Sequence, residues 1–133
     1  LWFKDTQGKY LYANKAIKDW LLLDDHPEGK TDIELATGAK LKYGEREHTF
    51  GEVCSNSDVD VIDNMYEGKT YVESGKVKGK MLHLEVNKSV VLLDGSLLGV
   101  VGSGRDITEY REELINSSQE DIFKKNEFVN KDV

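Results

Sequence analysis

The first thirty residues alternate between apolar and polar positions and then change to a helical spacing. Residues 1–5 and 9–13 alternate like two short strands, and the turn formers at 6–8 separate them. A helical face follows, because apolar residues recur three or four positions apart: Ala16, Ile17, Trp20, Leu21 and Leu23. The sequence therefore predicts a hairpin followed by an amphipathic helix, which ends at the His-Pro-Glu-Gly segment 26–29.

The middle of the chain predicts short helices. Thr31 and Asp32 can cap a helix that runs through Leu35. Residues 37–52 are charged and have no clear period, so we expect them to be irregular or briefly helical. Residues 55–58 can cap a further helix, whose apolar face carries Val59, Ile62, Met65 and Tyr66.

Beyond Gly68 the pattern becomes that of strands. Residues 70–78 predict one strand, 81–93 a long second strand, and 97–105 its partner across the Asp94-Gly95 turn. From residue 109 the period is helical again. This order predicts an α+β domain that has an antiparallel sheet with helices on one face and a helix leaving its last strand.

Strand alternation also predicts which side chains line the interior. Leu82, Leu84 and Val86 share one face of their strand, and Val100, Gly102 and Gly104 share one face of the next. The opposite positions are mostly polar, so we expect these two sets to point inward and, with Met65 and Tyr66, to form the wall of a ligand pocket. The two glycines could equally serve only to permit tight packing, and both interpretations stay open.

Composition narrows the class of protein. The 133 residues suffice for one domain, and the net charge of −7 argues against a nucleic-acid surface. No apolar run approaches the roughly 20 residues that cross a bilayer. A single cysteine fits a reducing compartment, so we expect a cytoplasmic fragment without membrane contact, of a parent protein that could be tethered elsewhere. The many acidic residues are interpreted as solvated faces.

Six segments together resemble a PAS domain, in the order that this family shows. They are the residues 2–16, Gly29-Lys30-Thr31-Asp32, the residues 84–89, Asp94-Gly95, the residues 99–102 and Asp106-Ile107-Thr108. The resemblance covers residues 1–115. It implies a five-stranded antiparallel PAS fold over 1–108, a helical connector over 109–133, and a role in sensing and dimerisation without catalytic residues.

The end of the predicted domain suggests how a signal would leave it. Asp106, Ile107 and Thr108 join the sheet to the helix, and Asp106 or Thr108 can cap that helix. The apolar pairs 114/115, 122/123 and 128/129 recur about seven residues apart, which predicts a weak homodimer seam. The alternative is a helix that folds back onto its own sheet.

No known cofactor motif appears. Cys54 lacks the sequence context of a flavin-adduct cysteine, and a buried bystander thiol is the better interpretation. The helix 58–66 has no histidine for haem, and covalent haem would need a Cys-x-x-Cys-His motif. His26, His48 and His83 lack a second ligand at metal spacing, and His48 is interpreted as solvated. A small organic molecule is therefore the most that the sequence supports as a ligand.

The last residues hint at an output domain in the same chain. Residues 125–133 resemble the lead-in to a GGDEF diguanylate cyclase, with Asp132-Val133 as its first two residues. The alternatives are a histidine kinase and an interaction module that binds no ligand.

Overall fold

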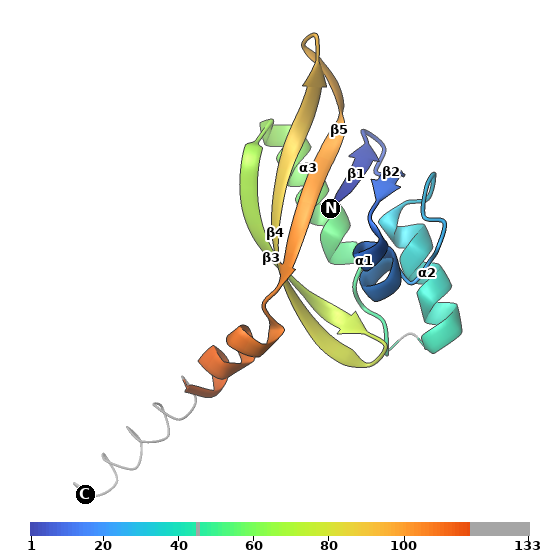
Figure 1. The fold of residues 1–133 in the computed structure, drawn as a ribbon, viewed down its shortest axis with the longest axis vertical. Helices are drawn as coiled ribbons and strands as arrows, with labels where there is room; N and C mark the ends of the chain where they lie inside the picture. The colour runs from blue at the N-terminus through green and yellow to red at the C-terminus, as the bar shows by residue number, and fades with distance from the viewer. Residues whose placement is uncertain (45, 118–133) are drawn as a thin grey trace, which may run out of the picture.

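The fold is a five-stranded antiparallel sheet that carries its helices on one face (Figure 1). The computed structural model describes residues 1–44 and 46–117, apart from the side chains of residues 52, 53 and 55. The strand order is β2-β1-β5-β4-β3. The strands are β1 (Trp2–Asp5), β2 (Tyr10–Ala13), β3 (Glu67–Val77), β4 (Lys80–Leu93) and β5 (Ser96–Asp106). This arrangement confirms the α+β class and the predicted order of elements.

Along the chain, the helices come after β2 and before β3. They are α1 (Lys15–Ile17), its continuation as a π-helical turn η1 (Lys18–Leu22), α2 (Asp32–Tyr43) and α3 (Glu52–Asn64). The side chain of Thr31 accepts a hydrogen bond from the N–H of Glu34, as the predicted cap requires. Helix α3 packs against β3, β4 and β5. None of the described helices is long and apolar enough to cross a bilayer.

Two boundaries differ from the expectation. Helix α2 continues to Tyr43, through a stretch expected to be irregular or only briefly helical, because Leu35, Ala36 and Ala39 give it a buried face despite its charged residues. Helix α3 begins at Glu52, so the residues 55–58 that were expected to cap it lie inside the helix. Within it, Cys54, Ser57, Asp58 and Val61 are all buried, and this periodic face is what continues the helix.

The longest hairpin forms as predicted. Asp94 and Gly95 both have positive φ, 50° and 80°, which matches the two central positions of a type I′ turn. The backbones of β4 and β5 pair antiparallel from Leu84↔Asp106 to Leu93↔Ser96. The inward faces follow the expected alternation, since Leu84, Val86 and Val100 are buried.

The tryptophan on β1 fills the centre of the sheet's inner face. Trp2 is only 4% exposed, and its backbone pairs with Gly102 on β5. A Cβ atom built on Gly102 would lie 2.4 Å from the Trp2 indole, whereas one on Gly104 would lie 3.5 Å away. The space left by the missing side chain of Gly102 is therefore occupied by the indole of a neighbouring strand.

Residues 108–117 are helical and leave the body of the domain (Figure 1). Tyr110, Leu114 and Ile115 are exposed on this helix. The first of the three predicted apolar pairs, 114/115, is thus exposed. The pairs 122/123 and 128/129 lie outside the described residues.

Replacing Gly102 by alanine should destabilise the fold, because the new methyl group would clash with the Trp2 indole. We expect a loss of about 1–3 kcal/mol in the free energy of unfolding, measured by urea denaturation. Gly104→Ala is the matched control on the same strand and should cost less, since its methyl group would make an ordinary contact. Equal effects of the two substitutions would contradict this account of the packing.

Candidate functional site

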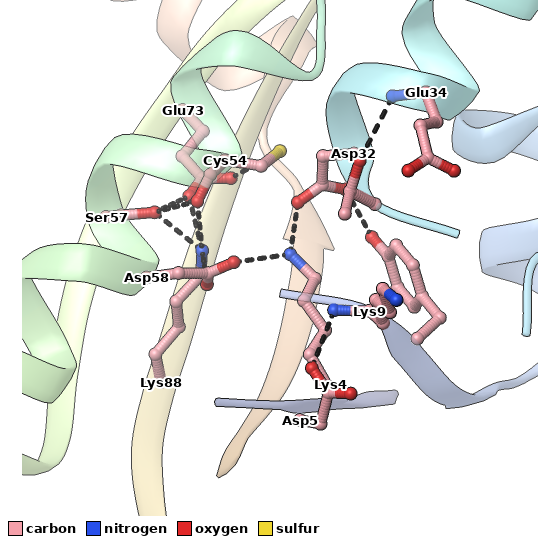
Figure 2. A network of polar contacts seen from close by, with 12 residues as sticks. Lys4, Asp5, Lys9, Asp32, Glu34, Cys54, Ser57, Asp58, Glu73 and Lys88 are labelled. Carbon is pink, nitrogen blue, oxygen red and sulfur yellow. Dashed lines mark hydrogen bonds and ion pairs between the residues drawn. The ribbon is translucent and has the colours of Figure 1, made fainter. Parts of the chain in front are cut away.

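Five charged side chains lie together in the interior between the helices and the sheet (Figure 2). They come from five elements: Lys4 from β1, Asp32 from α2, Asp58 from α3, Glu73 from β3 and Lys88 from β4. Counted as whole residues with their backbone, none is more than 7% exposed. We call these five residues the charge network.

The half of the network near β1 is centred on Lys4. Its ammonium group donates hydrogen bonds to the carboxylates of Asp32 and Asp58, the second at 2.6 Å. The Tyr10 hydroxyl donates to the other oxygen of Asp32 at 2.6 Å. The Lys4 nitrogen also lies 4.9 Å from the centre of the Tyr10 ring, within the range of a cation–π interaction.

The other half is centred on Lys88. Its ammonium group lies 2.7 Å from Asp58 Oδ1 and 3.0 Å from Glu73 Oε1, and it donates to the Ser57 hydroxyl at 2.6 Å. The thiol of Cys54 donates to the second oxygen of Glu73 at 3.4 Å. Asp58 therefore bridges the two lysines, one through each carboxylate oxygen (Figure 2).

The network is well satisfied by hydrogen bonds but carries unequal charge. Two lysines against three carboxylates leave a formal charge of −1 when all five are ionised. Burying a charge is costly unless it is paired and hydrogen-bonded, and removing one partner of a buried pair leaves the other uncompensated. The network therefore fixes the relative positions of two helices and three strands.

Sequence reasoning missed this network. The interpretation of the acidic residues as solvated faces is wrong for Asp32, Asp58 and Glu73, which are buried. One signal was available: Lys88 continues the inward alternation of Leu84 and Val86 and precedes the buried Val90. A lysine at an inward position destabilises the core unless buried carboxylates pair with it, and Lys88 pairs with Asp58 and Glu73.

The surroundings shift the proton affinities of neighbouring groups. Burial, followed by the charge of Asp32, raises the pKa of the Tyr10 hydroxyl well above its usual range. Burial, again with Asp32 as the leading charge, raises the pKa of the Cys54 thiol. Burial alone would lower the pKa of Lys4, but the charges of Asp32 and Asp58 outweigh it and raise that pKa.

The centre of the domain is nearly filled. A cavity of about 10 Å³, room for about one water molecule, lies among Asp32, Leu35, His48, Phe50 and Cys54. His48 is 3% exposed, so the expectation that it is solvated is wrong; it packs inward because the segment after α2 crosses this cavity. Its Nδ1 atom has no hydrogen-bond partner among the described residues, and burial lowers its pKa.

Two larger hollows open to the surface. A pocket of about 240 Å³ lies beside the charge network, with Lys4, Asp32 and Asp58 in its lining. A groove of about 620 Å³ runs between α1 with η1 and the β3–β4 hairpin. The exposed Trp20 and Met81 lie in this groove.

The structure distributes the residues predicted as a pocket wall over different environments. Leu84 and Val86 belong to the main core cluster and Gly102 packs on Trp2. Leu82, Leu84 and Gly104 border the groove, and Val100 borders the 240 Å³ pocket. Tyr66 is half-buried against a second cluster formed by Val61, Val90 and Val100, whereas Met65 is 45% exposed. These eight residues therefore do not enclose one common cavity.

The three residues at the end of β5 are bonded to β4. The N–H of Ile107 donates to the carbonyl of His83 at 2.9 Å, and the N–H of His83 donates to the Thr108 hydroxyl at 3.0 Å. Asp106 accepts a hydrogen bond from the N–H of Thr108 at 2.9 Å, which makes it the capping side chain. The His83 ring in turn lies 2.5 Å from the Ser74 hydroxyl on β3. The start of the C-terminal helix is thus tied to the two strands at that edge of the sheet.

No group of three histidine, cysteine, aspartate or glutamate side chains within the described ranges could hold a metal ion. Cys54 is buried, as expected of a structural thiol, but it donates to Glu73 and so is part of the network's surroundings.

The fold is an α+β domain with a five-stranded sheet, and one helix leaves it after the last strand. The model of the PAS fold family matches residues 1–112, and the chain belongs to this family. A search of curated protein sequences found no match.

Three solved structures resemble the chain, all with low sequence identity. The VqmA dimer of Vibrio cholerae is 20% identical with a TM-score of 0.58, over 82% of this chain and 46% of that one. The PAS domain of Bordetella pertussis BvgS is 21% identical with a TM-score of 0.51, over 90% and 82%. The sensor region of a sensor histidine kinase is 16% identical with a TM-score of 0.53, over 83% and 40%. The chain thus spans less than half of the first and third, and these likenesses show the fold.

Replacing Lys88 by methionine should be strongly destabilising, because Asp58 and Glu73 would lose a buried cation. We expect a loss of about 3–5 kcal/mol in the free energy of unfolding. Arg105→Met is the matched control: it removes a cation from the exposed pair with Glu85 and should cost no more than about 1 kcal/mol. Urea denaturation measures both, and similar losses would show that the network does not stabilise the fold.

Stability should fall as the pH rises above about 9. Cys54, Tyr10 and Lys4 all hold their protons more tightly in the folded protein, while the unfolded chain begins to lose them near 9.0, 10.0 and 10.5. The unfolded state then binds fewer protons, so this stability is complete below these values and is lost above them. Denaturation midpoints between pH 8 and pH 11 test this. In a Tyr10→Phe variant, stability should decline less steeply above pH 10. A wild-type stability that does not change between pH 8 and pH 11 would contradict the prediction.

Proposed function

We propose that this domain is a sensor that passes its signal through residues 106–108 to the C-terminal helix and from there to an output domain. The observation that carries the proposal is the pair of hydrogen bonds between His83 on β4 and Ile107 and Thr108. Lys88 of the charge network lies on the same strand, β4, so the network and the start of the helix are connected through one strand. In this proposal residues 1–108 sense and residues 109–133 connect.

The connector is proposed to pair two copies of the chain. Tyr110 and Leu114 are one helical turn apart and both exposed, and Ile115 extends the same apolar surface. A helix that leaves the body with an uncovered apolar side is suited to a parallel partner helix. A homodimer of this kind would let a sensor reorient two output domains together.

The output domain is proposed to be a diguanylate cyclase that makes cyclic-di-GMP, with a histidine kinase as the alternative. Support comes from the resemblance of residues 125–133 to a GGDEF lead-in. The sequence that follows Val133 in the parent gene decides between them, and a kinase or unrelated domain there would overturn the cyclase. The absence of a membrane-spanning helix among the described residues is compatible with the proposed cytoplasmic location.

A second candidate function is an interaction module without a ligand. It is favoured by the nearly filled centre, where the cavity of about 10 Å³ leaves no room for an organic molecule. Native mass spectrometry of the purified chain separates the two: a retained small molecule supports a ligand sensor, and its absence supports the module.

Placing a negative charge on the apolar side of the helix should prevent pairing. We expect the full 133-residue chain to sediment as a dimer and Leu114→Glu to sediment as a monomer or to dissociate at a roughly tenfold higher concentration, about 1.4 kcal/mol. Asn116→Glu is the matched control, since it adds the same charge on the opposite side of the helix. Equal sedimentation of Leu114→Glu and the wild type would remove this helix from any dimer.

A further inference from the structure

The pocket beside the charge network has the geometry of a small binding site. Its volume is about 240 Å³, below the roughly 300–1,000 Å³ of pockets that hold drug-sized ligands. Three sides come from separate parts of the chain: the β1–β2 turn at residues 5–8, the start of α2 at residues 31–33, and the middle of α3 at residues 58–62. Lys4 and Val100 add the sheet. An occupant would therefore contact the sheet and both helices at once.

The carboxylate of Asp58 is the group in this lining that is best placed to bind an occupant. Its side chain is 10% exposed, which is more than the side chain of any other member of the charge network. Each of its oxygens accepts one hydrogen bond, from Lys4 at 2.6 Å and from Lys88 at 2.7 Å. A carboxylate offers about four acceptor positions, so Asp58 can accept a further donor without giving up either lysine.

The charge of the lining selects the sign of that donor. Lys4 contributes +1 and Asp5, Asp32 and Asp58 contribute −3, so the lining has a formal charge of −2. The single cation is not available to an anion, because its ammonium group already donates to Asp32 and Asp58 and lies over the Tyr10 ring. A cation would instead offset the excess negative charge of the network.

The rest of the pocket selects the body of the occupant. Ile33, Val59, Ile62 and Val100 supply aliphatic surface, and the lining offers more apolar than polar surface. An ammonium group on a short hydrocarbon chain satisfies both requirements, since its head can donate to Asp58 while its chain lies against the aliphatic residues.

We propose that this pocket binds a small organic cation, a primary ammonium group on a short aliphatic body, with Asp58 as its acceptor. That binding of this cation acts as a signal rests on the sensory function proposed above. A bound ammonium group would share Asp58 with Lys4 and Lys88, and both lysines belong to strands that pair with β5. Since β5 ends at Asp106, the pocket and the start of the C-terminal helix share one strand.

Binding of n-butylammonium to the full chain tests the proposal, measured by calorimetry and by NMR shifts, with n-butanol and butyrate as neutral and anionic probes. We expect n-butylammonium to bind about tenfold or more tightly than n-butanol and butyrate not to bind, with the largest shifts at residues 4–8, 31–33, 58–62 and 100. Equal affinity for n-butanol, tighter binding of butyrate, or no binding of n-butylammonium would each overturn it.

Variants on α3 locate the site. Val59 is 57% exposed and lines the pocket, so Val59→Trp should fill the pocket, keep the fold and weaken n-butylammonium binding at least tenfold. Asn56→Trp places the same side chain on the same helix outside the lining and should leave binding unchanged. Asp58→Asn should also abolish the preference for the cation; should that variant fail to fold, Val59→Trp still decides. Sedimentation of the same variants distinguishes failure of this proposal from failure of the proposed function. If the pocket binds no ligand, the variants should still form the dimer through the C-terminal helix.

Discussion

Asp58 is the residue on which the interior depends, because it joins two buried lysines that have few other ways to be neutralised. Lys4 and Lys88 enter from β1 and β4, on either side of β5, and the helices must bring carboxylates to them. Asp58 does this from the middle of α3, with Asp32 at the start of α2 and Glu73 on β3 completing the set (Figure 2). The positions of the helices over the sheet therefore follow from charge pairing as well as from apolar packing.

This constraint changes what the domain can sense. The centre, where a hollow was expected, is occupied by the Trp2 indole over Gly102 and by the charge network. The space that remains is at the side of the network, where polar groups meet the surface. The occupant proposed for that space is accordingly small and carries a charge, because the interior around Trp2 and the charge network is nearly filled.

The C-terminal helix is anchored to the sheet at its start, which links its orientation to that of β4. Its first residues are held by hydrogen bonds to His83, whereas its later described residues make an exposed apolar surface (Figure 1). This arrangement suits the proposed connector. The hydrogen-bonded first turn takes its orientation from the sheet, and the exposed apolar face can pack against a partner helix. The low identity to the three similar structures leaves the chemistry of this chain to be judged from its own residues.

The sequence by itself determined the elements of this protein. Strand alternation, the Asp94-Gly95 turn and the Thr31 cap are local signals, and the strands and helices appear where these signals place them. The α+β class follows from their order, and so does the inward direction of Leu84, Val86 and Val100. Helix boundaries were less accurate, because the buried faces of α2 and α3 depend on contacts with distant residues.

Only the tertiary structure decided which polar residues are buried together. The five residues of the charge network are separated by up to 84 positions in the chain, from 4 to 88. Apart from the inward register of Lys88, nothing in their local sequence distinguishes them from the solvated acids and lysines around them. Likewise, the choice between a hollow and a filled centre at Gly102 depended on where the Trp2 side chain points. Burial and pairing are properties of three-dimensional proximity, so a one-dimensional pattern can show that a lysine faces inward but not which carboxylate meets it there.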